Sequence, residues 1–179
     1  FLEWEKRHEI SNEASCMIVD WNEIMHYVDD AIGLCAFLSS FRGGQFGGRP
    51  PYHINNIPHF INLATGMELD PDGLWEIASR NRNLVRALNV RRGMRRKDER
   101  PPKNHWAVRD HEFEQKLLDD YYEFKGWNKE GIPTKETLDK LGLDYVSKDF
   151  LQRGIISGEG IPSPKTSVEK KEELKSGGC

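Results

Sequence analysis

The sequence predicts an all-α fold, in which several helices of unequal length are joined by long, irregular loops. Apolar residues recur at three- and four-residue steps in several segments, as they do on the buried face of a helix. Few segments show the alternation with period two that is typical of strands. Pairs of glycine and proline separate the helical segments, and such pairs interrupt both helices and strands.

The first helix is expected from Met17 to about Ala31, because apolar residues form one stripe along this segment. An irregular loop is expected over residues 41–52, which carry four glycines and two prolines. Asn56 is expected to cap a short helix that has a proline in its first turn and ends at Gly66.

A longer helix is expected to begin at Asp70 and Pro71 and to run to about Val90, because an aspartate followed by a proline is a typical helix start. Its apolar residues predict the face that it buries. They are Ile77, Leu84, Val85 and Leu88.

Three further helices are expected in the second half of the chain. One spans about residues 111–125 and ends at a glycine. Thr134 is expected to cap the next, which ends at Gly142, and Ser147 is expected to cap the last, which ends at Gly154.

The expected domain organisation has three parts. Residues 1–16 form a lead-in segment whose apolar groups cover a neighbouring surface, and residues 17–156 form the helical domain. Residues 157–179 form a flexible, charged tail, because large apolar side chains are nearly absent there. The chain begins with neither a methionine nor a signal peptide, which suggests a piece of a longer protein.

The composition excludes some classes of protein. The net charge is −3 and the pI is about 6.1, whereas proteins that bind nucleic acids or membrane surfaces usually carry a basic excess. No apolar run reaches the roughly 18 residues of a membrane span. Cys16, Cys35 and Cys179 form no CxxC pair, which suits a reduced, cytoplasmic protein.

A basic cluster follows the long helix, and two interpretations of it stay open. It is either a solvated or acid-paired surface, or a contact with an anionic cofactor or partner. Its residues are Arg91, Arg92, Arg95, Arg96, Lys97 and Arg100.

The most informative motif is Asp30-Ala31-Ile32-Gly33-Leu34-Cys35. It places a carboxylate and a thiol five residues apart around a glycine at the end of the first helix, where they can hold a cofactor. A buried helix end, in which Cys35 is only a small hydrophobe, explains the same pattern. A thiolate can also bind an iron–sulfur cluster, but the other ligands would then lie outside these residues. No catalytic residue can be named.

Three motifs resemble the C-terminal part of the tungsten-containing aldehyde ferredoxin oxidoreductases, over roughly residues 17–154. They are Asp30-x-x-Gly33-Leu34-Cys35, the segment Leu84–Gly93 before Arg96-x-Asp98, and Tyr121-Tyr122-x-x-x-Gly126-Trp127-Asn128-x-x-Gly131-Ile132-Pro133-Thr134. Within this family, three further segments resemble the tungsten subunits of ATP-independent (class II) benzoyl-coenzyme A reductases. They are Pro50–Ile54, Arg92–Arg96 and Pro101-Pro102-x-Asn104-His105-Trp106.

The resemblance implies an oxidoreductase with a tungsten bis-pyranopterin and a 4Fe-4S cluster, both of which also need residues outside this chain. It makes Asp30 a hydrogen-bond acceptor for one pyranopterin, and it makes Gly33 and Leu34 the residues that shape the turn. Cys35 becomes the fourth cluster ligand. The implied partners are the N-terminal remainder of the same protein, an iron–sulfur electron-transfer subunit or ferredoxin, and an acyl-CoA substrate.

The closer resemblance implies reduction of the aromatic ring of benzoyl-CoA to a cyclic dienoyl-CoA, in anaerobic aromatic degradation. Aldehyde oxidation is the nearest enzyme alternative, although residues 98–103 replace the Asp-Asp-x-Leu-Pro-x-Arg of the aldehyde enzymes. A helical interaction module without a cofactor is the alternative from another class. The loop of residues 41–52 and the basic cluster are candidates for shaping the substrate channel or binding CoA phosphates.

Overall fold

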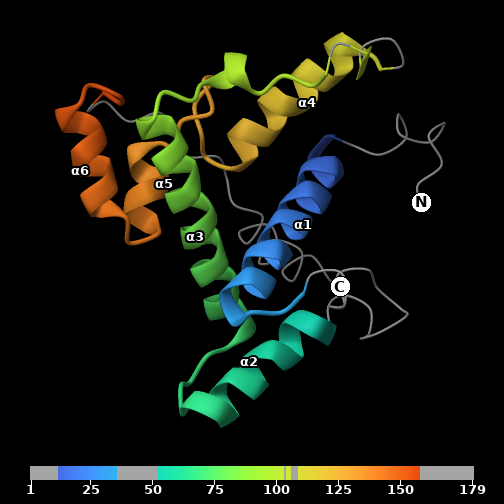
Figure 1. Ribbon diagram of the computed structural model, residues 1–179, viewed down its shortest axis with the longest axis vertical. Helices are drawn as coiled ribbons and strands as arrows, with labels where there is room; N and C mark the ends of the chain where they lie inside the picture. Colours follow the sequence, from blue (N-terminus) through green and yellow to red (C-terminus); the bar gives the residue numbers. More distant parts are fainter. Residues whose placement is uncertain (1–11, 36–51, 103, 106–108, 158–179) are drawn as a thin grey trace, which may run out of the picture.

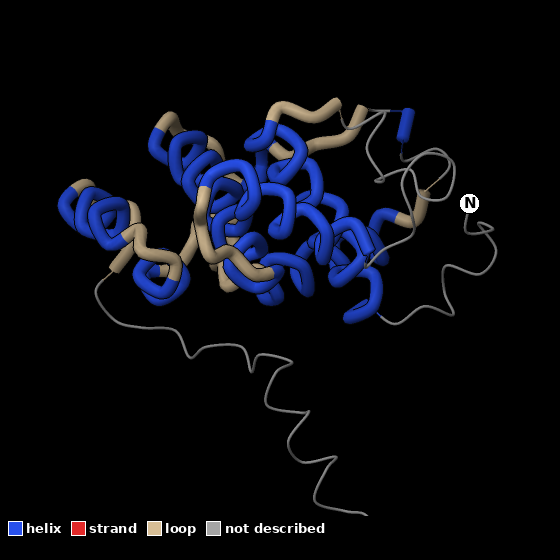
Figure 2. Tube along the Cα trace, turned by 90° about the horizontal axis from the view of Figure 1, so that it is seen from below, coloured by secondary structure: helices blue, strands red, loops and turns tan. Residues whose placement is uncertain are grey.

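The computed structural model describes residues 12–35, 52–102, 104–105 and 109–157. Within these ranges the only extended pairing is a single bridge between Trp127 and Pro133, so the predicted all-α class is confirmed (Figure 2). Its helices are α1 (Asn12–Ile32), α2 (Tyr52–Thr65), α3 (Pro71–Arg91), the short η3 (Arg96–Asp98), α4 (His111–Phe124), α5 (Lys135–Lys140) and α6 (Asp144–Gln152).

Some sequence expectations fall outside the described residues. These are the lead-in segment up to residue 11, the glycine-rich loop up to residue 51, and the tail from residue 158. None of the helices in the described ranges has both the length and the hydropathy that crossing a bilayer requires.

Two predicted helix caps are confirmed. Asp70 precedes α3, and its Oδ1 accepts a hydrogen bond from the backbone N–H of Gly73 at 2.7 Å. Thr134 precedes α5, and its Oγ1 accepts one from the backbone N–H of Thr137 at 3.2 Å. Both side chains satisfy donors that the first turn of a helix leaves unpaired.

Two other predicted caps are wrong, and α1 starts earlier than expected. α1 begins at residue 12, five residues before Met17, and α2 begins four residues before Asn56, which therefore lies inside the helix. Ser147 lies inside α6, where its hydroxyl donates to the Asp139 carboxylate at 2.5 Å and contacts the Asp144 carbonyl oxygen at 3.0 Å. A serine is stable in a helix interior when its hydroxyl is satisfied in this way.

α3 is the helix around which the other helices are arranged (Figure 1). α1 and α2 pack on its N-terminal half in a first core of Ile24, Met25, Val28, Ile57, Leu74 and Ala78. A second core joins its C-terminal half to α5 and α6 through Ala87, Val90, Ile132, Leu138, Leu143, Val146 and Phe150. A third core between α1 and α4 contains Cys16, Tyr121, Tyr122 and Trp127.

The face that α3 buries differs from the predicted stripe. Val85 and Leu88 are 41% and 46% exposed, whereas Asn83 and Arg86 are almost fully buried. Asn83 accepts a hydrogen bond from the Trp127 indole at 2.8 Å, and Arg86 donates to Glu99. Their polar groups are thus satisfied by distant parts of the chain, which an apolar periodicity cannot reveal.

We predict that Gly131→Ala lowers the free energy of unfolding by roughly 3 kcal/mol, because two costs add. Gly131 has φ +71°, and a Cβ there would collide with the Arg86 guanidinium and lie 2.8 Å from the Tyr122 ring. Gly154→Ala is the matched control, because Gly154 has φ +65° but no atom within 4 Å of the added Cβ. It should cost only about 1 kcal/mol. Urea denaturation measures both, and equal losses would contradict the prediction.

Candidate functional site

The end of α1 is a Schellman motif, which turns the chain sharply away from the helix. The Leu34 N–H donates to the Asp29 carbonyl at 2.8 Å, and the Gly33 N–H donates to the Asp30 carbonyl at 3.4 Å. This pair of bonds requires a left-handed residue between them, and Gly33 has φ +74°. The glycine in the motif therefore fixes the direction in which the chain leaves α1.

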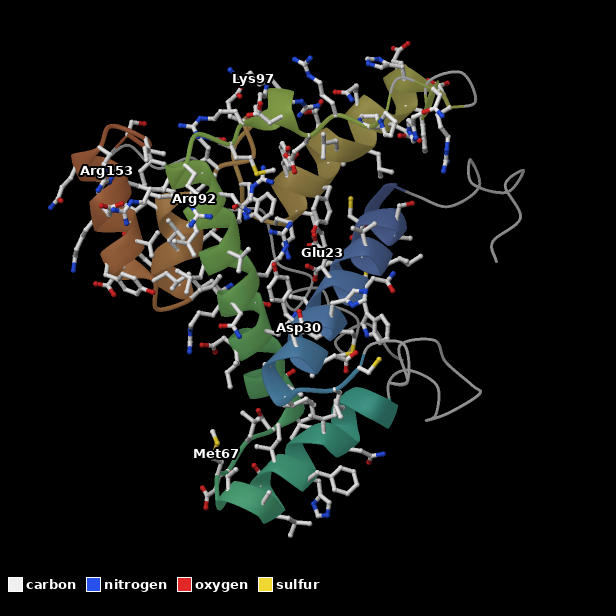
Figure 3. All side chains as sticks on the ribbon, in the orientation of Figure 1. Glu23, Asp30, Met67, Arg92, Lys97 and Arg153 are labelled. Carbon is white, nitrogen blue, oxygen red and sulfur yellow. The ribbon has the colours of Figure 1, made fainter. Side chains whose placement is uncertain are left out.

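The turn leaves the predicted site residues at one exposed end of α1. The side chain of Asp30 is exposed, Leu34 is 46% exposed, and Cys35 is a free, exposed cysteine. The neighbouring Asp29 is instead buried. In Figure 3, Asp30 lies at the end of α1 that approaches α2. The alternative in which Cys35 is a buried hydrophobe is therefore wrong for this chain.

The last turns of α1 have a rigid base, because Ile24, Met25 and Val28 are fully buried against α2 and α3. Ile57 supplies the contact from α2, and Leu74 and Ala78 supply it from α3. Side chains on well-packed helices hold their positions more precisely than side chains on loops. The Asp30 carboxylate, in the last turn of α1, is thus presented from a fixed support.

A cluster of buried charges lies on the other side of α1 and ties it to α3 and α4. The Glu23 carboxylate accepts from Arg82 at 2.8 Å and from the Tyr121 hydroxyl, and Lys125 pairs with Asp20. Burial alone would raise the pKa of Glu23, but the hydrogen bond and charge of Arg82, with help from Tyr121 and Lys125, hold it below its ordinary value. Burial and Glu23 together raise the pKa of Tyr121, so it stays a neutral donor.

A second buried charge, Arg86 on α3, holds the segments that follow α3 and α4. Its guanidinium donates to both Glu99 oxygens, at 2.7 and 2.8 Å, and to the Gly131 carbonyl at 2.7 Å. The Tyr122 hydroxyl also donates to Glu99. Burial, followed by Glu99, raises the pKa of Tyr122 to about 12. Burial opposes ionisation of Glu99, yet Arg86 and Tyr122 lower its pKa.

Arg82 and Arg86 are not among the residues that the sequence analysis singles out by their chemistry. Only their spacing indicates that they act together. Residues four apart share one face of a helix, and both guanidinium groups lie over the Trp127 ring, at 4.8 and 4.6 Å from its centroid. The partner glutamates are 59 and 13 residues away in the chain. No local pattern contains them.

The basic cluster after α3 is acid-paired in part, as one of the two interpretations predicted. Arg91 lies 3.7 Å from Asp149 and Arg96 lies 2.5 Å from Asp119. Arg95 is also engaged, because its guanidinium donates to two backbone carbonyls. Three of the six cationic side chains of the cluster are therefore paired with an acid or directed inward.

Four side chains of the basic cluster are exposed: Arg91, Arg92, Lys97 and Arg100. Lys97 and Arg100 line a surface pocket together with His111 and Glu130. Figure 3 shows Lys97 near the top of the view and Asp30 near its middle, at the lower end of α1. The exposed Lys97 thus lies on a different part of the molecule from the exposed end of α1.

The exposed end of α1 has groups that fit a pyranopterin and one corner of an iron–sulfur cluster. The Asp30 carboxylate accepts hydrogen bonds, as do the last carbonyls of α1, and a pterin ring is rich in N–H donors. The Cys35 thiol is accessible. Cys16 does not suit a cluster at this end, because its side chain is buried in the third core between α1 and α4. Burial, followed by the charge of Asp120, also raises the pKa of its thiol to about 11.

A cluster at Cys35 needs further ligands from outside the described ranges. Within those ranges no three His, Cys, Asp or Glu side chains are placed to hold a metal ion. Iron–sulfur clusters usually take four cysteine thiolates, so this chain would supply only part of the site.

Comparisons with known proteins give the chain a family. The pattern described as "Aldehyde ferredoxin oxidoreductase, domains 2 & 3" matches residues 2–143. The tungsten-containing aldehyde ferredoxin oxidoreductases of Pyrococcus horikoshii and Pyrococcus furiosus are both 27% identical to the chain, over 151 and 145 residues. In each case the match covers 76% of this chain and 22% of the relative.

A solved structure is more similar. In the active-site complex BamBC of benzoyl-coenzyme A reductase with 1,5-dienoyl-CoA, one chain is 56% identical and superposes with a TM-score of 0.75. The match covers 83% of this chain and 22% of that chain, so this chain spans about a fifth of the length of the relatives it matches. Because the family pattern covers most of its residues, the chain belongs to the aldehyde ferredoxin oxidoreductase family of oxidoreductases.

Proposed function

We propose that the chain is the C-terminal part of a tungsten enzyme that reduces the aromatic ring of benzoyl-CoA to a cyclic dienoyl-CoA. The observation that carries this proposal is its 56% identity to a chain of the benzoyl-CoA reductase complex, against 27% to the aldehyde oxidoreductases. An iron–sulfur electron-transfer subunit or ferredoxin and the acyl-CoA substrate are the partners that this activity requires.

In this proposal, the exposed end of α1 contacts the cofactors. Asp30 accepts hydrogen bonds from one of the two pyranopterins, and Cys35 is one ligand of the 4Fe-4S cluster. Gly33 and Leu34 hold the turn between them. The tungsten and its pyranopterins supply the electron-transfer chemistry when bound, and the residues of this chain orient them.

The packing of the chain supports this division of roles. Arg82 and Arg86 fix α3 against α1 and against the segment before α4, and the first core fixes the last turns of α1. Asp30 and Cys35 belong to neither network. Their side chains are not needed for the packing of this chain. They are therefore available to contact a group outside it.

Oxidation of aldehydes is the competing activity, and substrate assays on the complete enzyme separate the two. Asp98 and Glu99 have structural roles: Asp98 accepts from the Arg95 N–H at 2.9 Å, and Glu99 pairs with Arg86. These residues therefore give no support to an aldehyde site. Reduction of benzoyl-CoA without oxidation of aldehydes is the expected outcome.

Replacing Cys35 tests the cluster assignment. In the full-length enzyme, Cys35→Ala should abolish the EPR signal of the 4Fe-4S cluster and the activity, because one of its four ligands is lost. Cys16→Ala is the matched control, since Cys16 is buried in the third core, and its variant should keep the signal. A cluster signal of wild-type intensity in Cys35→Ala would rule out the ligand role.

The exposed part of the basic cluster also has a proposed role, which is binding of the CoA phosphates. Lys97 and Arg100 are the candidates, because both are exposed and line the surface pocket, whereas Arg95 and Arg96 are engaged within the chain. Cationic side chains around a surface pocket are suited to phosphate groups.

Kinetics of the complete enzyme test this role. The double variant Lys97→Ala with Arg100→Ala should raise the KM for benzoyl-CoA about tenfold with little change in kcat, because it removes binding that the ground and transition states share. Lys140→Ala, at the exposed end of α5, is the control and should leave the KM unchanged. An unchanged KM in the double variant would remove the proposed phosphate site.

A further inference from the structure

α2 is unusual in this chain because it lacks charge. Its 14 residues, Tyr52–Thr65, contain no Asp, Glu, Lys or Arg, although 31% of the whole chain is charged. Helices at the surface of a soluble protein usually carry charged side chains on the side that faces water. A helix without them is typical of a protein interior.

α2 nevertheless covers a core with only one of its sides. Ile57 and Pro58 are buried, and Ile57 contacts the first core. Of the residues turned away from that core, Asn56 and His59 are polar and exposed. Phe60 is 67% exposed and Leu63 is 73% exposed. Ala64 is exposed beside them, and the spacing of these three residues places them on one side of the helix. We call Phe60, Leu63 and Ala64 the outer face of α2.

A further exposed apolar side chain follows the end of α2. Met67 is 50% exposed, and Figure 3 shows it at the outer edge of the molecule. Large apolar side chains that gather on an exposed surface often mark a surface that another element covers.

We propose that, in the full-length protein, the outer face of α2 is covered by a segment of the same polypeptide that lies outside residues 1–179. This proposal rests on the proposed function only in assuming that the chain is part of a longer subunit. α2 is then an internal helix of that subunit.

Two observations favour this occupant over a separate partner. The matched part is 22% of the chain in the benzoyl-CoA reductase complex, so a longer subunit has ample polypeptide to cover α2. The absence of charge indicates permanent burial, since interfaces that form and separate are more polar and obligate ones resemble a protein core.

The position of α2 also suits this occupant. α2 shares its first core with Met25 and Val28, in the last turns of α1. A segment that covers α2 from outside therefore clamps it against the helix that carries Asp30 and Cys35. The packing of that segment on α2 would also bring the rest of the subunit close to the exposed end of α1.

Photo-crosslinking of the complete gene product, purified with its natural partner subunits, tests the proposal. A photoreactive phenylalanine analogue replaces Phe60 in one sample. In a control sample it replaces Tyr145, which is 58% exposed on the charged helix α6. After irradiation, the expected product from the first sample keeps the mass of a single subunit. Peptide mass spectrometry should join position 60 to a residue outside 1–179 of that subunit, with no such link from position 145.

Each other outcome overturns the proposal. These are a link to a second copy, to a different subunit or to residues within 1–179, no link at all, or a gene product with no residues beyond 1–179. The crosslink needs neither tungsten nor a cluster. A positive link in a protein without these cofactors would therefore leave this inference standing while the proposed function failed.

Discussion

Arg82 and Arg86, one turn apart on α3, hold the rest of the structure in place. Arg82 reaches Glu23 on α1, Arg86 reaches Glu99 after α3, and both lie over Trp127 after α4. Cation–π contacts contribute about 0.5–2 kcal/mol each, whereas removing one partner of a buried ion pair costs about 3–5 kcal/mol. Glu23 and Glu99 are each about a quarter exposed, so the loss of either lies at the lower end of that range. The hydrogen-bonded ion pairs still outweigh the stacking.

The local features of the fold could be predicted from the sequence, but the burial of polar side chains could not. Period and capping residues identify α3, α4 and α5, because these signals lie within one or two turns of the helix that they define. The buried face of α3 was predicted wrongly because the partners of Asn83 and Arg86 lie on other segments. Asn56 and Ser147 were misread as caps for a related reason: both residue types cap helices often, but tertiary packing decides where a helix starts.

The motifs that carry the family resemblance have two different physical roles. The segment Tyr121–Thr134 is a packing motif: its tyrosines and Trp127 form the third core, and Gly131 leaves room for the Arg86 guanidinium. Arg86, within the segment Leu84–Gly93, supplies the charge for that packing. The motif at the end of α1 is the exception, since Asp30 and Cys35 are exposed and belong to none of the three cores. This contrast separates residues that maintain the fold from those proposed to contact cofactors, which the sequence could name only through the resemblance.

The tungsten and pterin content of the full-length Asp30→Ala variant tests the central claim most directly. Asp30 is exposed, so its replacement should leave the three cores intact, and Glu123→Ala removes another exposed carboxylate, on α4, as the control. If the end of α1 holds a pyranopterin, Asp30→Ala protein should fold but retain much less tungsten and pterin than wild-type and Glu123→Ala protein. A full complement of both in folded Asp30→Ala protein would contradict the account.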